Sequence, residues 1–321
     1  MKAIHRVLKY EIFPRQEEQF PLMWEKFFGR SAPLFVEIGF GNGEFLVEWA
    51  RQHPEGNMVG FEIAMESMER AQKLIHTAQI PNVRVIREEA RWGLQEFFAE
   101  NSIRHVMMNF PDPWPKKRHQ ERRAINQTFA QILGHVLEPE GIFELVTDQK
   151  WYAEAAHAIF NESQFFTVSS IETNPPRPVQ TKYERKWRRL GRDIYRLQAH
   201  KVASAAIERK ILEEPMPHKI IRTPVTREQV VKLQNYQEEA GSTFFIVKEI
   251  YLAPEENHYL LKTIAKDEDY MQKFFIVITP HRDGWIVKLD TVTQPYRTPA
   301  VKFSVYQVAQ FLENTAGSSQ Q

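Results

Sequence analysis

Acidic side chains follow several consecutive predicted strands, and a glycine-rich turn follows the first of them. In parallel α/β sheets the carboxyl ends of the strands meet at one edge, where ligands bind. Carboxylates at that edge can accept hydrogen bonds from ribose hydroxyls and attract a cationic group. The residues concerned are Glu37 with the turn Gly39-Phe40-Gly41-Asn42-Gly43, Glu62 after the second strand, Glu89 after the third and Asp112 after the fourth.

The glycine spacing separates two classes of ligand. Gly39, Gly41 and Gly43 give G-x-G-x-G, whereas a dinucleotide fingerprint would place its third glycine where Glu44 stands. A pyrophosphate against Glu44 would meet a like charge. S-adenosylmethionine (SAM) carries a sulfonium, an ammonium and a ribose but no phosphate, and it fits better. Glu37 can then face the cationic part, Glu62 the ribose hydroxyls and Glu89 the adenine amino group. The alternative for each single acid is an ordinary charge at a helix N-terminus.

A stiff proline-rich loop follows the fourth strand and leads into a basic run. The loop is Asn109-Phe110-Pro111-Asp112-Pro113-Trp114-Pro115, and each proline fixes one backbone torsion. The alternative is that the loop only connects two elements and that Trp114 packs against the hydrophobic core. Because the basic run adjoins the predicted ligand site, we favour phosphate contact. Its residues are Lys116, Lys117, Arg118, Arg122 and Arg123.

A second basic stretch points to a nucleic acid. Between Lys182 and Arg196 there are seven basic residues against Glu184 and Asp193. Tyr183 and Trp187 are interleaved among them, and aromatic rings can stack on bases. Packing of both rings on the core is the alternative. Two such segments near one site favour an RNA or DNA substrate over a small molecule.

The elements that must position these residues alternate between strand and helix from residue 32 to 200. This alternation is typical of a parallel sheet built from βαβ units. The predicted strands are 34–38, 58–63, 83–86, 103–108, 142–147 and 165–172, and the predicted helices are 44–52, 65–79, 91–100, 121–137 and 151–160.

The length of 321 residues predicts about two domains. We expect a leader at 1–31, a catalytic domain at 32–200 and a small α+β domain at 201–321. The last begins with a predicted helix at 203–212, continues through strands 243–250, 259–264, 273–278 and 285–289, and closes with a helix at 301–312. It carries 15 basic and 15 acidic residues, so we expect it to stabilise the protein or add auxiliary contacts.

Composition excludes several classes of protein. The chain has no cysteine, so disulfides, thiolate nucleophiles and iron–sulfur clusters are out. No apolar run approaches the roughly 18 residues of a membrane helix, and the start lacks a secretory pattern. We therefore expect a cytoplasmic protein without a membrane partner. The histidines are scattered, so no metal site is predicted, and either a monomer or a homodimer fits.

Five segments together resemble the bacterial tRNA (guanine-N7)-methyltransferase family over roughly residues 30–200. They are EIGFGNG at 37–43, GFEI at 60–63, NFPDPWPKKRH at 109–119, VTD at 146–148 and TKYERK at 181–186. The resemblance implies a class I SAM-dependent methyltransferase fold, with a Rossmann-like sheet covered by helices on both faces. It also implies methylation of N7 of a guanosine in the tRNA variable loop.

The resemblance also implies roles for individual residues. Asp112 falls on the catalytic position, and Glu37, Glu62, Glu89 and Asp112 fall on SAM-contacting positions. Glu89 departs from the shorter Asp or Asn expected there, and the part after residue 200 is absent from short members of the family. Substrate positions are Lys116, Asp148 and the segment Thr181, Lys182, Tyr183, Glu184 and Arg185, and the segment from Lys117 to Arg122 is expected to touch RNA.

The implied reaction needs no strong general base, because guanine N7 already has a free in-plane lone pair. Asp112 would accept hydrogen bonds from the guanine edge and offset charge developing on the ring. Three other functions stay open at this point. They are a nicotinamide-dependent oxidoreductase, which the glycine spacing disfavours, a methyltransferase acting on another nucleic-acid target, and a non-enzymatic RNA-binding protein on the same fold.

Overall fold

The computed structural model describes residues 9–116, 118, 123–253 and 257–317. The chain divides into two compact units, Met1–Glu208 and Arg209–Gln321. The division expected from sequence lies between residues 200 and 201. Among the described residues, no helix combines the length and the apolar character needed to cross a membrane.

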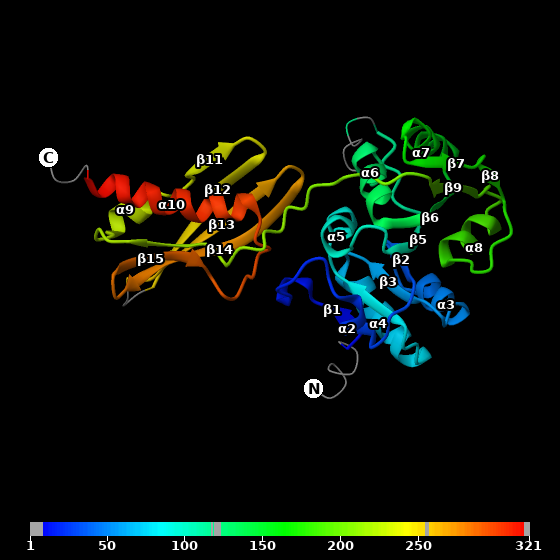
Figure 1. The fold of residues 1–321 in the computed structure, drawn as a ribbon, viewed down its shortest axis with the longest axis horizontal. Helices are drawn as coiled ribbons and strands as arrows, with labels where there is room; N and C mark the ends of the chain where they lie inside the picture. The colour runs from blue at the N-terminus through cyan, green and yellow to red at the C-terminus, as the bar shows by residue number, and fades with distance from the viewer. Residues whose placement is uncertain (1–8, 117, 119–122, 254–256, 318–321) are drawn as a thin grey trace. The chain divides into compact units, whose positions relative to one another are not determined.

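The first unit is built on one nine-stranded sheet in which the strands nearest the site run parallel (Figure 1). The order across the sheet is β1-β4-β3-β2-β5-β6-β9-β7, with β8 also paired to β9. Strands β7 and β8 are antiparallel to β9, which is itself antiparallel to β6. The bounds are β1 Glu11–Ile12, β2 Leu34–Ile38, β3 Asn57–Phe61, β4 Val83–Ile86, β5 Ile103–Asn109, β6 Leu137–Thr147, β7 Phe166–Val168, β8 Glu172–Thr173 and β9 Tyr195–Lys201.

Helices cover both faces of this sheet. Helices α3 and α4 pack together in one layer, while α6 packs against both α5 and α7 in the other. Chain order explains the two layers. From β2 to β4 the chain adds strands toward one edge of the sheet, and from β5 to β6 it adds them toward the other edge. Because each crossover is right-handed, this reversal puts the connecting helices on opposite faces. The bounds are η1 Pro14–Gln16, α2 Trp24–Phe28, α3 Glu44–Gln52, α4 Met65–Ala78, α5 Ala90–Phe97, α6 Gln127–Val136, α7 Lys150–Glu162 and α8 Lys182–Arg189.

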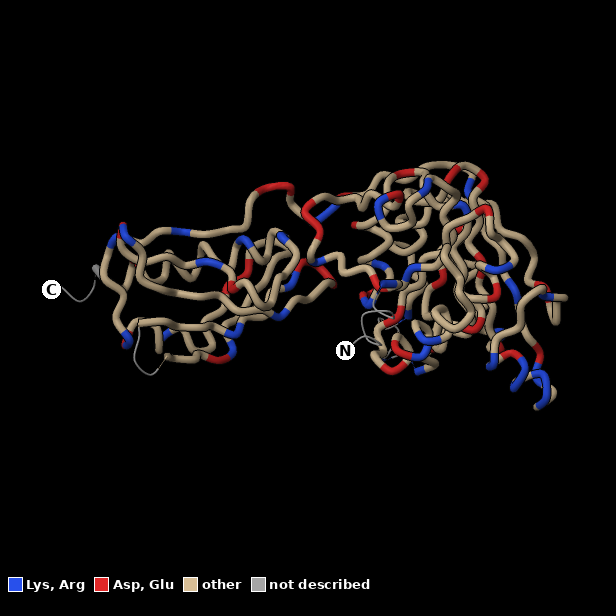
Figure 2. The backbone as a smooth tube through the Cα atoms, turned by 90° about the horizontal axis from the view of Figure 1, so that it is seen from below, with Lys and Arg blue, Asp and Glu red and all other residues tan. Residues whose placement is uncertain are grey.

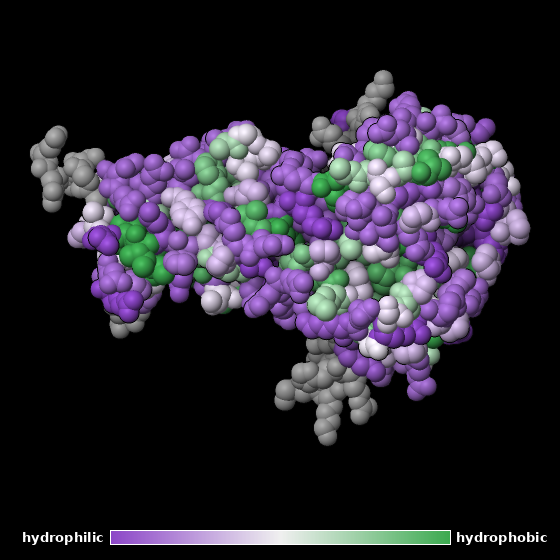
Figure 3. All heavy atoms as spheres, viewed as in Figure 1, coloured by the Kyte–Doolittle hydropathy of each residue, from purple (hydrophilic) through white to green (hydrophobic). Residues whose placement is uncertain are grey.

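The strand order reverses between β2 and β5, and the fold class follows from this order. Such a reversal opens a crevice outside the carboxyl ends of the strands, where ligands of α/β sheets bind. The sheet is the class I SAM-dependent methyltransferase arrangement expected from the sequence. Apolar side chains fill the spaces between sheet and helices, and hydrophilic residues cover most of the face seen in Figure 3.

Several expectations from the sequence need correction. The leader contains a strand, because β1 joins the sheet edge beside β4. The helix predicted at 203–212 is wrong. The segment is irregular because its backbone bonds to α5 and α6: Gln131 donates to Ala206 O at 2.7 Å and Gln95 to Glu208 O at 2.8 Å. The second basic stretch also holds two elements that we did not predict, α8 and the start of β9.

The second unit is a six-stranded antiparallel sheet with helices on one face. Its order is β10-β15-β14-β13-β12-β11, and the four strands and the closing helix predicted from sequence are confirmed. The hairpin predicted at Asp283-Gly284 joins β14 to β15. The bounds are β10 His218–Ile221, α9 Arg227–Val231, β11 Gln237–Ala240, β12 Thr243–Leu252, β13 Tyr259–Asp267, β14 Tyr270–His281, β15 Gly284–Leu289 and α10 Pro299–Gly317.

Candidate active site

The parallel strands end at nearly the same level, so the predicted acids share one edge of the sheet. In the register Ile38 pairs with Phe61, which pairs with Ile86, and on the other side Ile38 pairs with Met108. Met108 in turn pairs with Leu145. The residues that this brings to one edge are Glu37, Glu62, Glu89, Asp112 and Asp148.

The glycine turn after β2 adopts backbone conformations that side chains disfavour. Gly39, Gly41 and Gly43 have φ values of 70°, 55° and 80°. At Gly43 a Cβ would also lie 2.8 Å from the Cβ of Ala71 in α4. Residues with a Cβ rarely adopt such torsions, so glycine is required here. The turn therefore presents its backbone to the crevice without a side-chain screen.

Two of the predicted cofactor acids are already hydrogen-bonded to backbone. Glu62 accepts from Gly41 N at 3.1 Å through Oε2 and from the backbone before α4 through Oε1. Glu89 is the N-cap of α5 and accepts from Arg91 N and Trp92 N at 3.2 and 2.9 Å. Glu89 thus takes the helix-terminus role that the sequence left open for single acids, and its side chain remains 46% exposed.

Glu37 differs from the other acids because it is buried. It is 1% exposed, its Oε1 accepts from Asn109 Nδ2 at 3.1 Å, and its Oε2 has no partner among the described residues. Burial raises the pKa of Glu37 to about 8, although the Asn109 hydrogen bond and nearby Arg177 lower it in part. A buried carboxyl oxygen without a donor is unfavourable unless a ligand supplies one. Its place beside the glycine turn indicates a cationic ligand.

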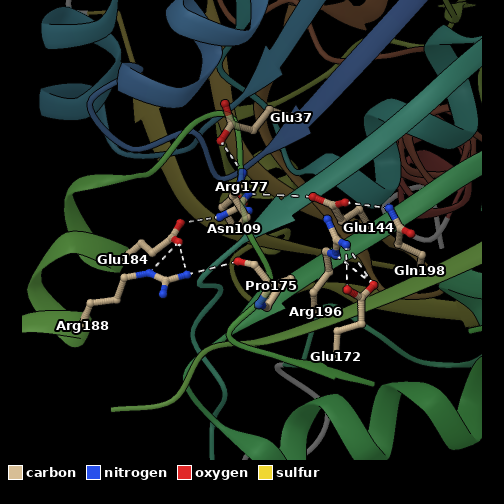
Figure 4. Close-up of polar contacts among 10 residues, drawn as sticks. All are labelled: Glu37, Asn109, Glu144, Glu172, Pro175, Arg177, Glu184, Arg188, Arg196 and Gln198. Carbon is tan, nitrogen blue, oxygen red and sulfur yellow. Dashed lines mark hydrogen bonds and ion pairs between the residues drawn. The ribbon is translucent and has the colours of Figure 1, made fainter. Parts of the chain in front are cut away.

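Asn109 connects Glu37 to a buried arginine (Figure 4). Arg177 Nη2 donates to Asn109 Oδ1 at 2.6 Å, and Arg177 Nη1 donates to Glu184 Oε2 at 2.7 Å. The Arg177 side chain is only 2% exposed, and its guanidinium lies 5.3 Å from the ring centroid of Phe45 in α3. The cofactor side of the site is thereby tied to the segment that precedes α8.

Glu184, which the family resemblance puts on a substrate-binding position, is fully buried. It is paired with Arg177 and with Arg188, the latter at 2.9 Å. Thr181 is also buried and caps α8, accepting from Glu184 N at 3.0 Å. The cap and the two ion pairs fix the first turn of α8, so these two residues shape the basic helix from inside.

The proline-rich loop holds Asp112 outward. Phe110 and Trp114, on either side of Asp112, both have positive φ, at 52° and 44°. Asp112 itself is exposed, as are Lys116 and Arg118. Arg123 donates to Trp114 O at 3.3 Å and lies 5.0 Å from the Trp151 ring, so it packs against the loop. Lys117 and Arg122 lie outside the described residues.

The exposed side of α8 is basic and borders the same edge of the sheet. Lys182, Tyr183 and Arg185 are exposed, and Arg185 donates to Glu44 at 2.8 Å in the first turn of α3. Asp148, after β6, is mostly buried and accepts from Arg192 at 2.8 Å. The Arg192 guanidinium stacks 4.1 Å from the Trp187 ring centroid. This ion pair joins the loop after α8 to the end of β6.

The residues present fit SAM. The glycine turn leaves its backbone uncovered, Glu62 fixes it, and the unpartnered Glu37 oxygen suits the cationic end of the ligand. In the part of the chain that the structure describes, no three His, Asp or Glu side chains are grouped as a metal site requires.

Sequence reasoning missed the two residues that link the halves of this site. From the sequence, Asn109 is only the start of the loop, and Arg177 is only part of a proline-rich break. The flanking Pro176 and Pro178 are a usable signal, because a single charged residue between prolines is held in one place.

Known proteins resemble the chain at three levels. A family described as "Putative methyltransferase" matches residues 31–197. A tRNA (guanine-N(7)-)-methyltransferase of Thermotoga maritima is 42% identical over 95% of this chain and 97% of its own length. A protein of the same name from Geobacillus thermodenitrificans is 34% identical over 55% of this chain and 83% of its own length. A solved antibiotic-related methyltransferase, 16% identical, covers 55% of this chain and 92% of its own, with a TM-score of 0.42.

Proposed function

The chain belongs to the tRNA (guanine-N7)-methyltransferase family, and from this premise we propose how its own residues carry out the reaction. The protein is a SAM-dependent enzyme that transfers a methyl group to N7 of a guanosine in tRNA. We place that guanosine in the variable loop, as the resemblance to the family implies. The roles of the individual side chains below are part of the proposal.

The cofactor-binding residues lie around the glycine turn and the ends of β2, β3 and β4. When bound, SAM supplies an electrophilic methyl group on a sulfonium. Gly39, Gly41 and Gly43 let the backbone approach it, and Glu37 Oε2 accepts from or faces its cationic end. Glu62 keeps acceptor capacity for ribose hydroxyls. Glu89 caps α5 and still presents part of its carboxylate toward the adenine position.

Asp112 is the proposed catalytic residue. Guanine N7 attacks through its own lone pair, so the enzyme has no proton to remove before the methyl group moves. The reaction then depends on alignment and on charge stabilisation. Asp112 is exposed on a loop with three prolines and two left-handed residues, so the backbone that carries its carboxylate is stiff. There it accepts hydrogen bonds from the guanine edge and offsets the positive charge that develops on the ring.

The RNA backbone is held by two basic segments beside this loop. Lys116, Arg118, Lys182 and Arg185 are exposed and supply phosphate contacts, and Tyr183 offers a ring, 57% exposed, for stacking on a base. Thr181 and Glu184 act from inside by fixing the first turn of α8. Asp148 positions the loop after α8 through its ion pair with Arg192. Lys117, Arg122 and Arg123 complete the proposed basic set.

The observation that carries this assignment is the buried Glu37 carboxyl beside the glycine turn, joined through Asn109 to the basic helix. The test is methyl transfer from radiolabelled SAM to a tRNA transcript, followed by nucleoside analysis. We expect N7-methylguanosine at one variable-loop position. A matched transcript with 7-deazaguanosine at that position, which lacks N7, should accept no label. A different methylated nucleoside would keep the fold and cofactor but overturn the target atom.

A further inference from the structure

The sheet of the second unit has two unlike faces. Helices α10 and α9 pack on one face, where Phe245, Leu261, Phe274 and Ile276 are buried in a common core. Side chains alternate along a strand, so the residues between these point to the opposite face. Among the described residues, no helix of this unit packs against that opposite face.

This opposite face carries two acids toward one side, Glu249 on β12 and Glu239 on β11, the latter paired with Phe244 in the register. On β13, β14 and β15, all within the described residues, it carries lysines and apolar residues and no acid. We call it the lysine face. The register fixes its rows, since Lys266 pairs with Met271, Ile264 with Lys273 and Lys262 with Phe275. A further row pairs Leu260 with Val277 and Val277 with Lys288. The members contributed by β13, β14 and β15 are Leu260, Lys262, Ile264, Lys266, Met271, Lys273, Phe275, Val277, Thr279, Ile286 and Lys288.

The charge on this face is local. The unit as a whole is electrically balanced, and Figure 2 shows basic and acidic residues interspersed along its trace. On the lysine face Lys262 is paired with Glu249 of the neighbouring strand β12 at 2.7 Å. Lys266, Lys273 and Lys288 are exposed. Lys266 and Lys273 stand in adjacent rows of adjacent strands, so the two residues are diagonal neighbours on this face.

Aromatic rings lie among these lysines. Tyr251, on β12, is 45% exposed, and its ring packs edge-on against Phe275 with centroids 5.9 Å apart. Phe244, on the same strand, pairs with Lys266 in the register and is half-buried. In an antiparallel sheet with one packed face, the residues on the face exposed to solvent are normally polar. Here most positions are apolar or aromatic, which marks an interaction surface.

We propose that the lysine face is a second tRNA-binding surface, which contacts the tRNA away from the methylated guanosine. The proposal rests on the tRNA substrate of the proposed function. Ammonium groups spaced among aromatic rings suit phosphates and exposed bases. A second copy of this chain would bring lysine against lysine across a two-fold interface, and a purely apolar partner would leave the three ammonium groups buried without partners.

The test compares two full-length triple variants with equal change in charge. One carries Lys266→Glu, Lys273→Glu and Lys288→Glu. The control carries Lys219→Glu, Arg227→Glu and Lys232→Glu, all exposed and on the edge or helices of the covered side. Binding of a tRNA transcript is measured over a range of salt, together with kcat and KM for methyl transfer.

We expect the lysine-face variant to weaken tRNA binding about tenfold or more and to lower the salt slope by about 3, one for each phosphate that the variant no longer neutralises. Its kcat at saturating tRNA should equal that of the wild type, which shows that the catalytic site still works. The control should stay within about twofold of the wild type in affinity, as expected of surface charges outside the RNA interface. A Lys→Gln triple variant at the same three positions should weaken tRNA binding and lower the salt slope by smaller amounts. It replaces the Glu variant in the test if the Glu variant does not fold.

Two results would overturn the proposal. One is a change in tRNA affinity and salt slope no larger than that of the control. The other is a wild-type dimer, seen by sedimentation, that the lysine-face variant dissociates while its tRNA affinity is unchanged. That second result would assign the face to self-association.

Discussion

Glu37 and Arg177 are joined through one side chain, the amide of Asn109. The amide nitrogen donates to Glu37 at 3.1 Å and the amide oxygen accepts from Arg177 at 2.6 Å. An amide offers both a donor and an acceptor, so it can serve a carboxyl group on one side and a guanidinium on the other. Glu37 and the segment leading into α8 therefore hold each other in position.

Replacing Asn109 with Leu should weaken SAM binding and lower the free energy of unfolding by about 1–3 kcal/mol, since both partners lose a buried hydrogen bond. Calorimetric titration with SAM and urea denaturation measure the two effects. Asn57→Leu is the matched control. Asn57 is also buried, 1% exposed against 9% for Asn109, and accepts from Arg30 at 2.9 Å, but it lies where β3 begins, at the other edge of the sheet. It should lose stability yet keep SAM affinity, and equal losses of affinity in both variants would contradict a specific role for Asn109.

The raised pKa of Glu37 predicts a pH dependence of stability. Burial raises this pKa from 4.5 to about 8, so the folded protein holds a proton that the unfolded chain releases. The contribution of Glu37 to stability is therefore present below about pH 4.5 and is lost as pH rises toward 8, by at most about 1.4 kcal/mol per pH unit. Urea denaturation from about pH 5 to about pH 8.5 should show a flatter profile for Glu37→Gln. Superimposable profiles would refute the assignment.

Substitution of Glu184 should mainly lower stability, whereas substitution of its neighbour Arg185 should mainly weaken tRNA binding. Glu184→Ala removes the shorter of the two ion pairs of the buried Arg177 and leaves only the pair with Glu144 at 3.8 Å, which should cost about 3 kcal/mol of stability. Arg185→Ala removes an exposed side chain and its surface ion pair with Glu44, so it should lower stability by no more than about 1 kcal/mol while raising the KM for tRNA. Thermal melts and steady-state kinetics separate the two. A stable Glu184→Ala protein that has lost only tRNA affinity would instead favour direct RNA contact by this carboxylate.

Asp112→Ala should lower kcat by about a hundredfold or more and leave the melting temperature unchanged. The reason is that Asp112 is exposed and stabilises positive charge that is absent from the guanine before the reaction and develops on its ring as the methyl group moves. Single-turnover methylation with saturating tRNA and SAM is the measurement. Glu162→Ala, an exposed acid at the end of α7, is the control. Near-normal turnover of Asp112→Ala would remove its catalytic role.

A protein ending at Glu208 should fold and keep some methylation activity. One ending at Lys201 should be less stable, because it loses hydrogen bonds that Ala205, Ala206 and Glu208 make to α5 and α6. Differential scanning calorimetry and methyl transfer to bulk tRNA test this pair. A folded protein ending at Glu208 without any activity would show that the second unit is needed for catalysis.

The sequence was most informative where structure depends on near neighbours in the chain. The strands from β2 to β5, the glycine turn and the hairpin after β14 follow from local apolar runs and turn residues, and they were predicted within a few residues. Strand β6 begins at Leu137, five residues before its predicted start. The contacts of Arg177 were not, because Asn109 and Glu184 are brought together only by tertiary packing. The irregular segment after β9 was not predicted for the same reason: its alanines favour a helix, but hydrogen bonds from α5 and α6 hold its backbone in an irregular conformation.

That same segment, residues 202–208, has an evolutionary consequence. It forms hydrogen bonds with α5 and α6 before the chain enters the second unit, so these contacts of the methyltransferase unit do not need residues 209–321. A gene segment encoding residues 209–321 can then be acquired or lost at this junction as a cassette, without any compensating change inside the catalytic core. Long and short lineages of one enzyme are the expected result.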